Sequence, residues 1–166
     1  MRNKKIDLKQ LMVLTMLGVL LPISKFALQY LPNVELVSLL LMVYTYRFGI
    51  KTLLPTYIFV GIEIMLYGIN IWNIMYLYVW AILVFASLPL KKVRKGWVFA
   101  FLSGMFGLLF GTLCSIPYFF AFGPSYAISW IISGLSYDLI HGVANFIVAF
   151  ILYIPLTNAM DRIKLN

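Results

Sequence analysis

Six long apolar stretches separated by short polar turns make up almost the whole chain. They cover about residues 8–30, 34–46, 52–69, 74–90, 97–120 and 127–156. A helix needs about 20 apolar residues to cross a hydrocarbon core of roughly 30 Å. The pattern therefore predicts an all-α integral membrane protein in which residues 1–166 form a single domain of six transmembrane helices. The second stretch is short for a full crossing, which indicates a tilted or partly buried helix.

The positive charges predict the orientation of these helices. Twelve of the thirteen Lys and Arg residues fall into four clusters, which are Arg2, Lys4, Lys5 and Lys9; Arg47 and Lys51; Lys91, Lys92, Arg94 and Lys95; and Arg162 with Lys164. After six crossings all four clusters lie on one side of the membrane. Short loops rich in Lys and Arg stay in the cytoplasm, so we expect both termini to be cytoplasmic.

The composition supports a membrane protein and excludes several other classes. Hydrophobic residues make up 63% of the chain, charged residues 11%, and the mean hydropathy is +0.98. Orientation explains the net charge of +8, and the basic residues are divided among loops, so we expect no nucleic-acid partner. A lone cysteine, Cys114, excludes an intramolecular disulfide and a cysteine-based zinc site.

The few polar residues inside the apolar stretches are the candidates for function, because an ionisable group at membrane depth is costly unless it is paired or faces a cavity. In the last stretch, Asp138, His141 and Asn145 share a helix face with Trp130 and Gly134. On the third and fourth stretches, the residues that share a face are Glu63 with Tyr67 and Asn70, and Trp72 with Tyr76 and Trp80. We expect Glu63 and Asp138 to face one outward cavity walled by Tyr76, Trp80 and Trp130.

Each of these candidates has a structural alternative. Asp138 and His141 can form an intrahelical pair, and Glu63 can pair with Lys25. Trp72 can belong to an interfacial aromatic belt. Asn33 and Glu35 can simply cap the second helix.

A stripe of small residues marks the fifth stretch, where Ser103, Gly107, Gly111 and Ser115 recur every four residues. Small residues at this spacing let two helix backbones approach closely in lipid. The contact can be within the chain or with a partner subunit.

No motif supports catalysis or energy coupling. The sequence has no zinc-protease helix, no phosphate-binding glycine loop and no nucleophile elbow. We therefore expect a protein that is not an enzyme and uses no cofactor or metal. An ion or proton pathway is disfavoured because residues 146–152 form an apolar seal below Asn145.

The chain resembles the substrate-capturing S components of energy-coupling factor (ECF) vitamin transporters, which are small bacterial proteins with six helices and basic inner loops. The resemblance covers essentially the whole chain. Its most specific segments are LPNVEL at 31–36, FGTLCSIP at 110–117 and DLIHGVANF at 138–146. It implies a multi-pass protein of the bacterial cytoplasmic membrane that works with a transmembrane coupling subunit and two ATPase subunits.

In this family the loop between helices one and two, with the outer halves of helices four to six, encloses the vitamin. The expected substrate-binding residues are therefore Asn33, Glu35, Glu63, Tyr67, Tyr76, Trp80, Trp130, Asp138, His141 and Asn145. Because the acids outnumber Lys25, we expect a pyridoxine-like or pyrimidine-like vitamin; cobalamin, with His141 or Cys114 as a cobalt contact, is the other option. The alternative function is a membrane assembly protein without a small-molecule ligand.

The first helix departs from the family at one point. Many members carry an Ala-x-x-x-Ala motif there that docks against the coupling subunit, whereas residues 15–22 of this chain read TMLGVLLP. Only Gly18 is strictly small. We therefore expect partner docking through Gly18 together with Ser103, Gly107 and Gly111.

Overall fold

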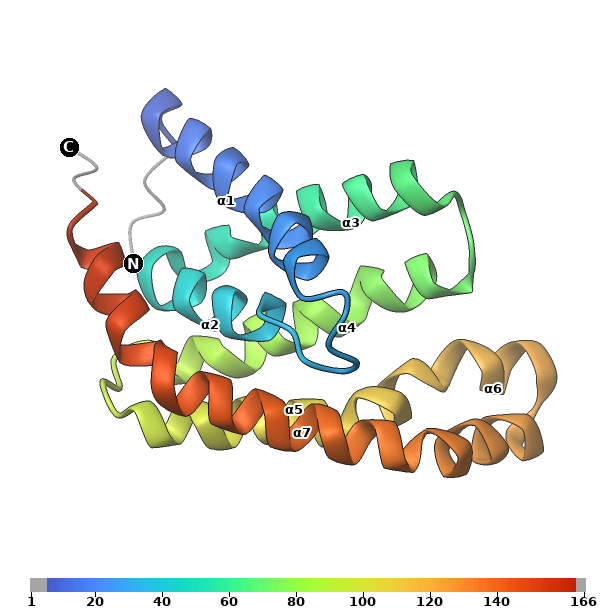
Figure 1. Ribbon diagram of the computed structural model, residues 1–166. Helices are drawn as coiled ribbons and strands as arrows, with labels where there is room; N and C mark the ends of the chain where they lie inside the picture. The colour runs from blue at the N-terminus through green and yellow to red at the C-terminus, as the bar shows by residue number, and fades with distance from the viewer. Residues whose placement is uncertain (1–5, 164–166) are drawn as a thin grey trace.

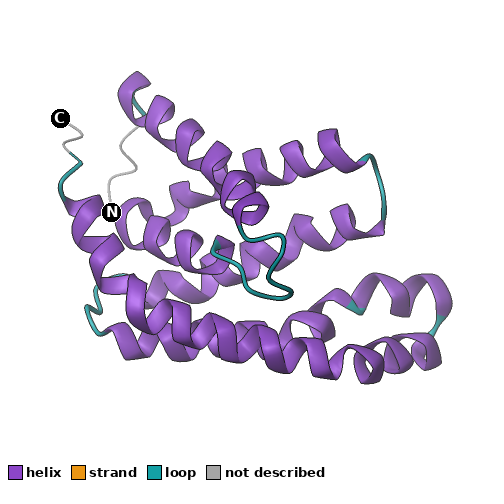
Figure 2. Ribbon diagram, viewed as in Figure 1, coloured by secondary structure: helices purple, strands orange, loops and turns teal. Residues whose placement is uncertain are grey.

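The computed structural model describes residues 6–163, and within this range the chain is helical and contains no strand (Figure 2). The elements are α1 (Leu8–Ala27), α2 (Val37–Phe48), the 3₁₀ helix η1 (Gly49–Thr52), α3 (Leu53–Tyr67), α4 (Ile71–Ser87), the 3₁₀ helix η2 (Leu88–Leu90), α5 (Gly96–Cys114), α6 (Ile116–Phe122) and α7 (Pro124–Asp161). The predicted all-α class is confirmed. Of the predicted basic clusters, Arg2, Lys4, Lys5 and Lys164 lie outside the described residues.

Five helical stretches within residues 6–163 are long and apolar enough to cross a membrane, rather than the six expected. They are Leu8–Ala27, Val37–Tyr67, Ile71–Leu90, Gly96–Phe122 and Pro124–Asp161. The expected second and third stretches form one continuous helical run, since η1 joins α2 to α3. Alone, α2 has only 12 residues, or about 18 Å at 1.5 Å per residue, which is less than the roughly 30 Å of a hydrocarbon core.

The chain nevertheless turns sharply between α2 and α3. Gly49 has a φ of 59°, a left-handed conformation that glycine adopts without steric cost. Figure 1 shows α2 and α3 running in opposite directions from this turn. The continuous run is therefore two helical rods, of which the first is short.

Prolines account for two other differences from the expected boundaries. The expected helix 97–120 is divided, because α5 ends at Cys114 and α6 begins at Ile116 with Pro117 in its first turn. Proline disfavours a helical conformation in the residue before it and has no N–H to donate. The last helix begins with Pro124 instead of near residue 127, since proline suits the first helical position.

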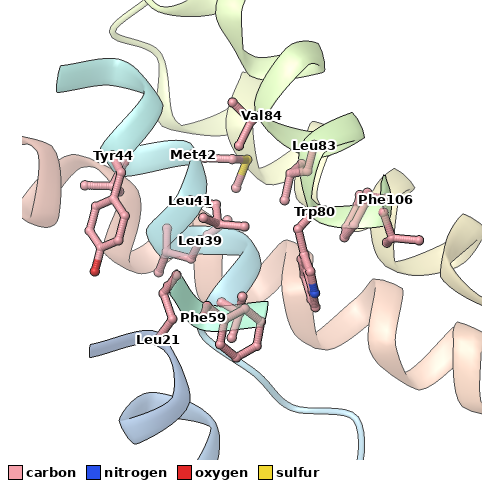
Figure 3. Packing of buried hydrophobic residues seen from close by; sticks show 14 of the residues in the cluster. Leu21, Leu39, Leu41, Met42, Tyr44, Phe59, Trp80, Leu83, Val84 and Phe106 are labelled. Atoms are coloured by element: carbon pink, nitrogen blue, oxygen red, sulfur yellow. The ribbon is translucent and has the colours of Figure 1, made fainter. Parts of the chain in front are cut away.

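The buried helix α2 forms the centre of the molecule. In Figure 1, α2 and α4 lie between the α1–α3 pair and the α5–α7 pair, and these neighbours are in contact. Leu39, Leu41 and Met42 of α2 are 0–1% exposed. Figure 3 shows them packed among side chains of the surrounding helices, including Leu21, Phe59, Leu83 and Val84. A buried helix is expected to be largely apolar, and apart from Ser38, Thr45 and Arg47 the residues of α2 are apolar or aromatic.

The outer faces of the helices are apolar as well. Large exposed side chains include Met16 on α1, Phe101 on α5 and Leu135 on α7, with exposed fractions of 71%, 62% and 65%. Monomeric soluble proteins rarely expose large contiguous apolar patches. The structure is therefore compatible with a multi-pass membrane protein.

The small residues proposed for partner docking pack inside the chain instead. A Cβ added at Gly107 would lie 2.8 Å from the Gly142 Cα on α7, and one at Gly18 would lie 2.8 Å from the Ile58 Cβ on α3. Ser103 is 1% exposed, and a Cβ at Gly111 would overlap the Asp138 carboxylate. These positions let the helices of this chain approach closely, so they offer no free docking surface. Only the spacing was readable from the sequence, and spacing does not identify the partner helix.

Polar contacts gather four segments at one end of the molecule. Lys51 Nζ donates to Gln10 Oε1 at 2.6 Å, and Arg47 Nη2 donates to the Ile163 carbonyl at 2.9 Å. Arg94, in the α4–α5 loop, forms a salt bridge with Asp161 at 3.0 Å. The start of α1, the α2–α3 turn, the α4–α5 loop and the end of α7 therefore meet here. The α3–α4 and α6–α7 connections lie at the other end, and the α1–α2 connection lies between the two ends, beyond the start of α2 (Figure 1).

Candidate functional site

A cavity of about 560 Å³ opens at the end away from the basic loops. Its walls come from α1, the α1–α2 connection, the start of α2, α3, α4, α5 and α7. The structure brings seven of the expected substrate-binding residues to this cavity, which are Asn33, Glu35, Tyr76, Trp80, Trp130, Asp138 and His141. Three others, Glu63, Tyr67 and Asn145, do not line it.

Aromatic rings line one side of this cavity from α4 to α5 and α7. Trp72, Tyr76 and Trp80 lie one helical turn apart on α4, so they face the same side. Trp72 packs edge-on against Trp130 of α7, with ring centroids 5.7 Å apart. Trp80 contacts Phe110 of α5 at a centroid distance of 5.6 Å. This arrangement offers flat apolar surfaces on which a ring-shaped ligand can stack.

Asp138 supplies a carboxylate to the cavity wall. Its Oδ1 accepts a hydrogen bond from the backbone N–H of Gly111 on α5 at 3.0 Å. The absence of a side chain at Gly111 leaves the space that the carboxylate occupies. Within residues 6–163 no Lys, Arg or His lies within salt-bridge distance of Asp138. The intrahelical ion pair with His141, which was the structural alternative, is therefore not formed, and this carboxylate has no cationic partner among the described residues.

His141 contacts Glu35 on the cavity wall instead. Its Nε2 lies 3.5 Å from Glu35 Oε1, and the ring packs edge-on against Phe110 with a centroid distance of 5.0 Å. Glu35 Oε2 accepts from the Ser38 N–H at 2.9 Å, so Glu35 also caps the start of α2, as the structural alternative proposed. Burial raises the pKa of Glu35, but the contacts with His141 and Ser38 outweigh it and hold this pKa below the ordinary value of 4.5.

Glu63 lies beside the cavity rather than in it, and it forms a salt bridge with Lys25 of α1. The Lys25 ammonium also lies over the rings of Tyr67 and Tyr76, at 5.3 and 5.4 Å from their centroids. These residues line a second cavity of about 360 Å³ with Trp72, Asn70 and Asn73. The two carboxylates of Glu63 and Asp138 thus do not face one cavity, because Glu63 is turned toward α1.

Asn145 belongs to the packing below the cavity. It is 1% exposed, and its Nδ2 donates to Ser38 Oγ at 3.4 Å, which links α7 to α2. Its place on the same helix face as Asp138 and His141 was predicted correctly, but it lies one turn deeper than the last residue of α7 that lines the cavity.

Sequence reasoning missed some of the lining residues. Phe110, Gly111 and Tyr137 contribute to the cavity, yet Gly111 was interpreted only as a packing position. Trp72 was expected on one face with Tyr76 and Trp80, with an interfacial belt as the alternative, and it lines the cavity. Among residues 6–163 there is no group of three His, Cys, Asp or Glu side chains that is placed to hold a metal ion.

Comparison of the chain with protein-family models, with curated proteins and with solved structures yields no match.

Proposed function

We propose that this chain is the substrate-capturing subunit, or S component, of an ECF-type importer in a bacterial cytoplasmic membrane. It binds a vitamin-like molecule from outside and delivers it inward with a separate coupling subunit and two ATPase subunits. One observation carries this proposal, namely the aromatic cavity of about 560 Å³ that contains an unpaired carboxylate at the end away from the basic loops. Sites for small molecules have volumes of about 300–1,000 Å³ and a few polar groups on apolar walls.

The positive charges support an outward-facing cavity. Lys51, Arg47 and Arg94 gather at the end that holds the start of α1 and the end of α7. By the positive-inside rule this end is cytoplasmic, so the cavity opens to the outside. In this proposal α2 and α3 count as separate passes, with α2 reaching only part of the way through the bilayer, and the chain passes six times.

The charge balance of the cavity supports a ligand that donates hydrogen bonds or carries positive charge. Lys25 is already matched by Glu63, and moving it to an anionic ligand would leave Glu63, which is 2% exposed, as an unpaired buried charge. Asp138 has no cationic partner among the described residues. A pyridoxine-like or pyrimidine-like ring suits this volume and these acceptors better than the much larger corrinoid of cobalamin.

The position of the small residues affects how the subunit would dock. Gly18 and Gly107 are covered by α3 and α7 of the same chain. The coupling subunit would therefore contact exposed apolar side chains, such as Met16 on α1, which is 71% exposed.

Mass spectrometry of small molecules that co-purify with the detergent-solubilised protein tests the proposal. We expect a ring-containing molecule that leaves on denaturation and raises the melting temperature when added back, because a ligand that binds only the folded state stabilises it. If no small molecule is retained and no fraction of a cell extract raises the melting temperature, the alternative of an assembly protein without a ligand is supported instead.

A further inference from the structure

Three buried polar atoms on the wall of the large cavity have no hydrogen-bond partner among the described residues. They are Trp80 Nε1, Glu35 Oε1 and His141 Nε2; the last two lie 3.5 Å apart as an ion-pair contact but form no hydrogen bond with each other. Trp80 and His141 are only 3% and 6% exposed. Buried polar groups of folded proteins nearly always have a hydrogen-bond partner. A ligand in the cavity can supply the acceptor that Trp80 Nε1 lacks and a hydrogen-bond donor to Glu35 Oε1.

The side chains of Trp80 and His141 mark the deep end of the cavity, and Glu35 contacts His141 there. Trp80 is the last lining residue of α4, and His141 is the last of α7, when each helix is followed from the outer end inward. Phe110 contacts both rings, with centroid distances of 5.6 Å to Trp80 and 5.0 Å to His141. In Figure 3 the indole of Trp80 extends away from α4 with its nitrogen near the far end of the side chain.

The other buried atoms without a partner lie elsewhere. In the part of the chain that the structure describes, they belong to Tyr44, Thr52, Glu63, Ser103 and Tyr153, and none of these residues lines the large cavity. Among the described residues with such an atom, only Glu35, Trp80 and His141 therefore line the large cavity.

The chemistry of these atoms defines a complementary ligand edge. An indole N–H can only donate, and a carboxylate oxygen can only accept. Trp80 therefore requires an acceptor on the ligand, and Glu35 requires a donor. A flat heterocycle meets both requirements when a ring nitrogen or carbonyl stands next to an amino or hydroxyl group.

We infer that the deep end of the cavity recognises the mixed acceptor–donor edge of a heteroaromatic ring. The ring acceptor receives the Trp80 Nε1–H, and the neighbouring N–H or O–H group donates to Glu35 Oε1 beside His141. This inference rests on the proposed function and names its substrate class, a heteroaromatic amine or alcohol. Trp80 is then a specificity residue for the acceptor, and Glu35 is one for the donor.

Three small probes separate the two contacts. 4-Aminopyrimidine carries the full edge, aniline lacks the ring acceptor, and 4-methylpyrimidine lacks the donor. We expect the full-length protein in detergent to bind 4-aminopyrimidine about tenfold more tightly than either of the other two, as measured by calorimetry. A tenfold ratio is the size expected when one buried hydrogen bond is lost.

Substitutions then assign each contact to a residue. Trp80→Phe should abolish the preference over aniline and keep the preference over 4-methylpyrimidine, whereas Glu35→Ala should do the reverse. Trp130→Phe is the control. It also removes an indole from this cavity, but the Trp130 nitrogen does not belong to the group of buried atoms that lack a partner. This substitution should weaken the binding of all three probes to the same extent. If Trp80→Phe does not fold, the inference is tested with Glu35→Ala, by comparing the affinities for 4-aminopyrimidine and 4-methylpyrimidine.

Some outcomes overturn this inference alone. They are a wild-type protein that binds all three probes equally or binds none of them, and a Trp80→Phe protein that keeps its preference over aniline. A co-purifying molecule without such an edge would also exclude the inference while leaving the proposed function in place. The proposed function fails separately, when no small molecule is retained and no extract fraction raises the melting temperature.

Discussion

The carboxylate of Asp138 on α7 occupies the space that a side chain would fill at Gly111 on α5, and it accepts the Gly111 N–H at 3.0 Å. The two residues are 27 positions apart in the sequence. A glycine is therefore required here so that the acidic group of the cavity can reach its position on the wall.

Gly111→Ala should consequently weaken binding of the co-purifying molecule by about tenfold, because the added methyl group forces the Asp138 carboxylate out of place. Calorimetric titration of the purified variant measures this. Gly61→Ala is the matched control, since no atom lies within 4 Å of a Cβ added there, and it should leave the affinity unchanged. An unchanged affinity in Gly111→Ala would show that the position of the carboxylate is not important.

Asp138→Asn and His141→Ala should each weaken binding by at least about 1 kcal/mol, because each removes a polar group that lines the cavity. Both variants should stay folded, which size-exclusion chromatography in detergent checks. Loss of folding in both variants would instead show that the two residues have a purely structural role.

The Lys25–Glu63 pair should matter for stability more than for binding. Lys25→Met leaves the Glu63 side chain, which is 3% exposed, without its counter-ion. This should lower the free energy of unfolding by about 2 kcal/mol. Glu63→Gln should cost less, since the Lys25 side chain is 36% exposed. In a double-mutant cycle of melting in detergent, the combined variant should lose less than the sum of the single losses. Additivity within about 0.5 kcal/mol would contradict the pairing.

Glu35 should make the folded protein less stable as the pH is lowered into the acid range. Its pKa in the folded protein lies below the ordinary value of 4.5, so the unfolded state binds the proton at higher pH than the folded state does. The stabilisation is complete above about pH 5 and is lost as the pH falls through the lowered pKa. Melting curves between about pH 6 and pH 3 should therefore fall more steeply for the wild type than for Glu35→Gln. Parallel curves would exclude this contribution.

The topology predicts from which side of the membrane a thiol reagent can reach each loop. With Cys114 replaced by Ala, a cysteine in place of Val93 in the α4–α5 loop should react only after the membrane is permeabilised. A cysteine in place of Leu31, which is 52% exposed in the α1–α2 connection, should react in intact cells. The reverse pattern would place the cavity on the cytoplasmic side.

Local spacing made part of the fold and of the site predictable. The length and apolar character of the stretches predicted the helices, and a spacing of four put Tyr76 and Trp80 on one face of α4. The same argument placed Asp138 and His141 together on α7. These predictions depend only on helix geometry, which any sequence obeys once it is helical.

Contacts between helices were not predictable in the same way. Glu63 was expected beside Asp138, but α3 is rotated so that Glu63 meets Lys25. Asp138, three residues before His141, was the partner suggested by spacing, yet His141 contacts Glu35 of the α1–α2 connection. A helix that is apolar all round gives no signal of its rotation about its axis, so partner choice depends on packing that only the structure reveals.

The shortness of α2 explains why the molecule has room for a ligand. Its first residue, Val37, and the preceding Glu35 both line the cavity, so the cavity occupies the depth that further helical turns would have filled. Its size is therefore determined by where a backbone element begins, and trimming or enlarging side chains adjusts only the walls. A relative of this chain that accepts a larger or smaller molecule would be expected to differ first in the length of this one helix.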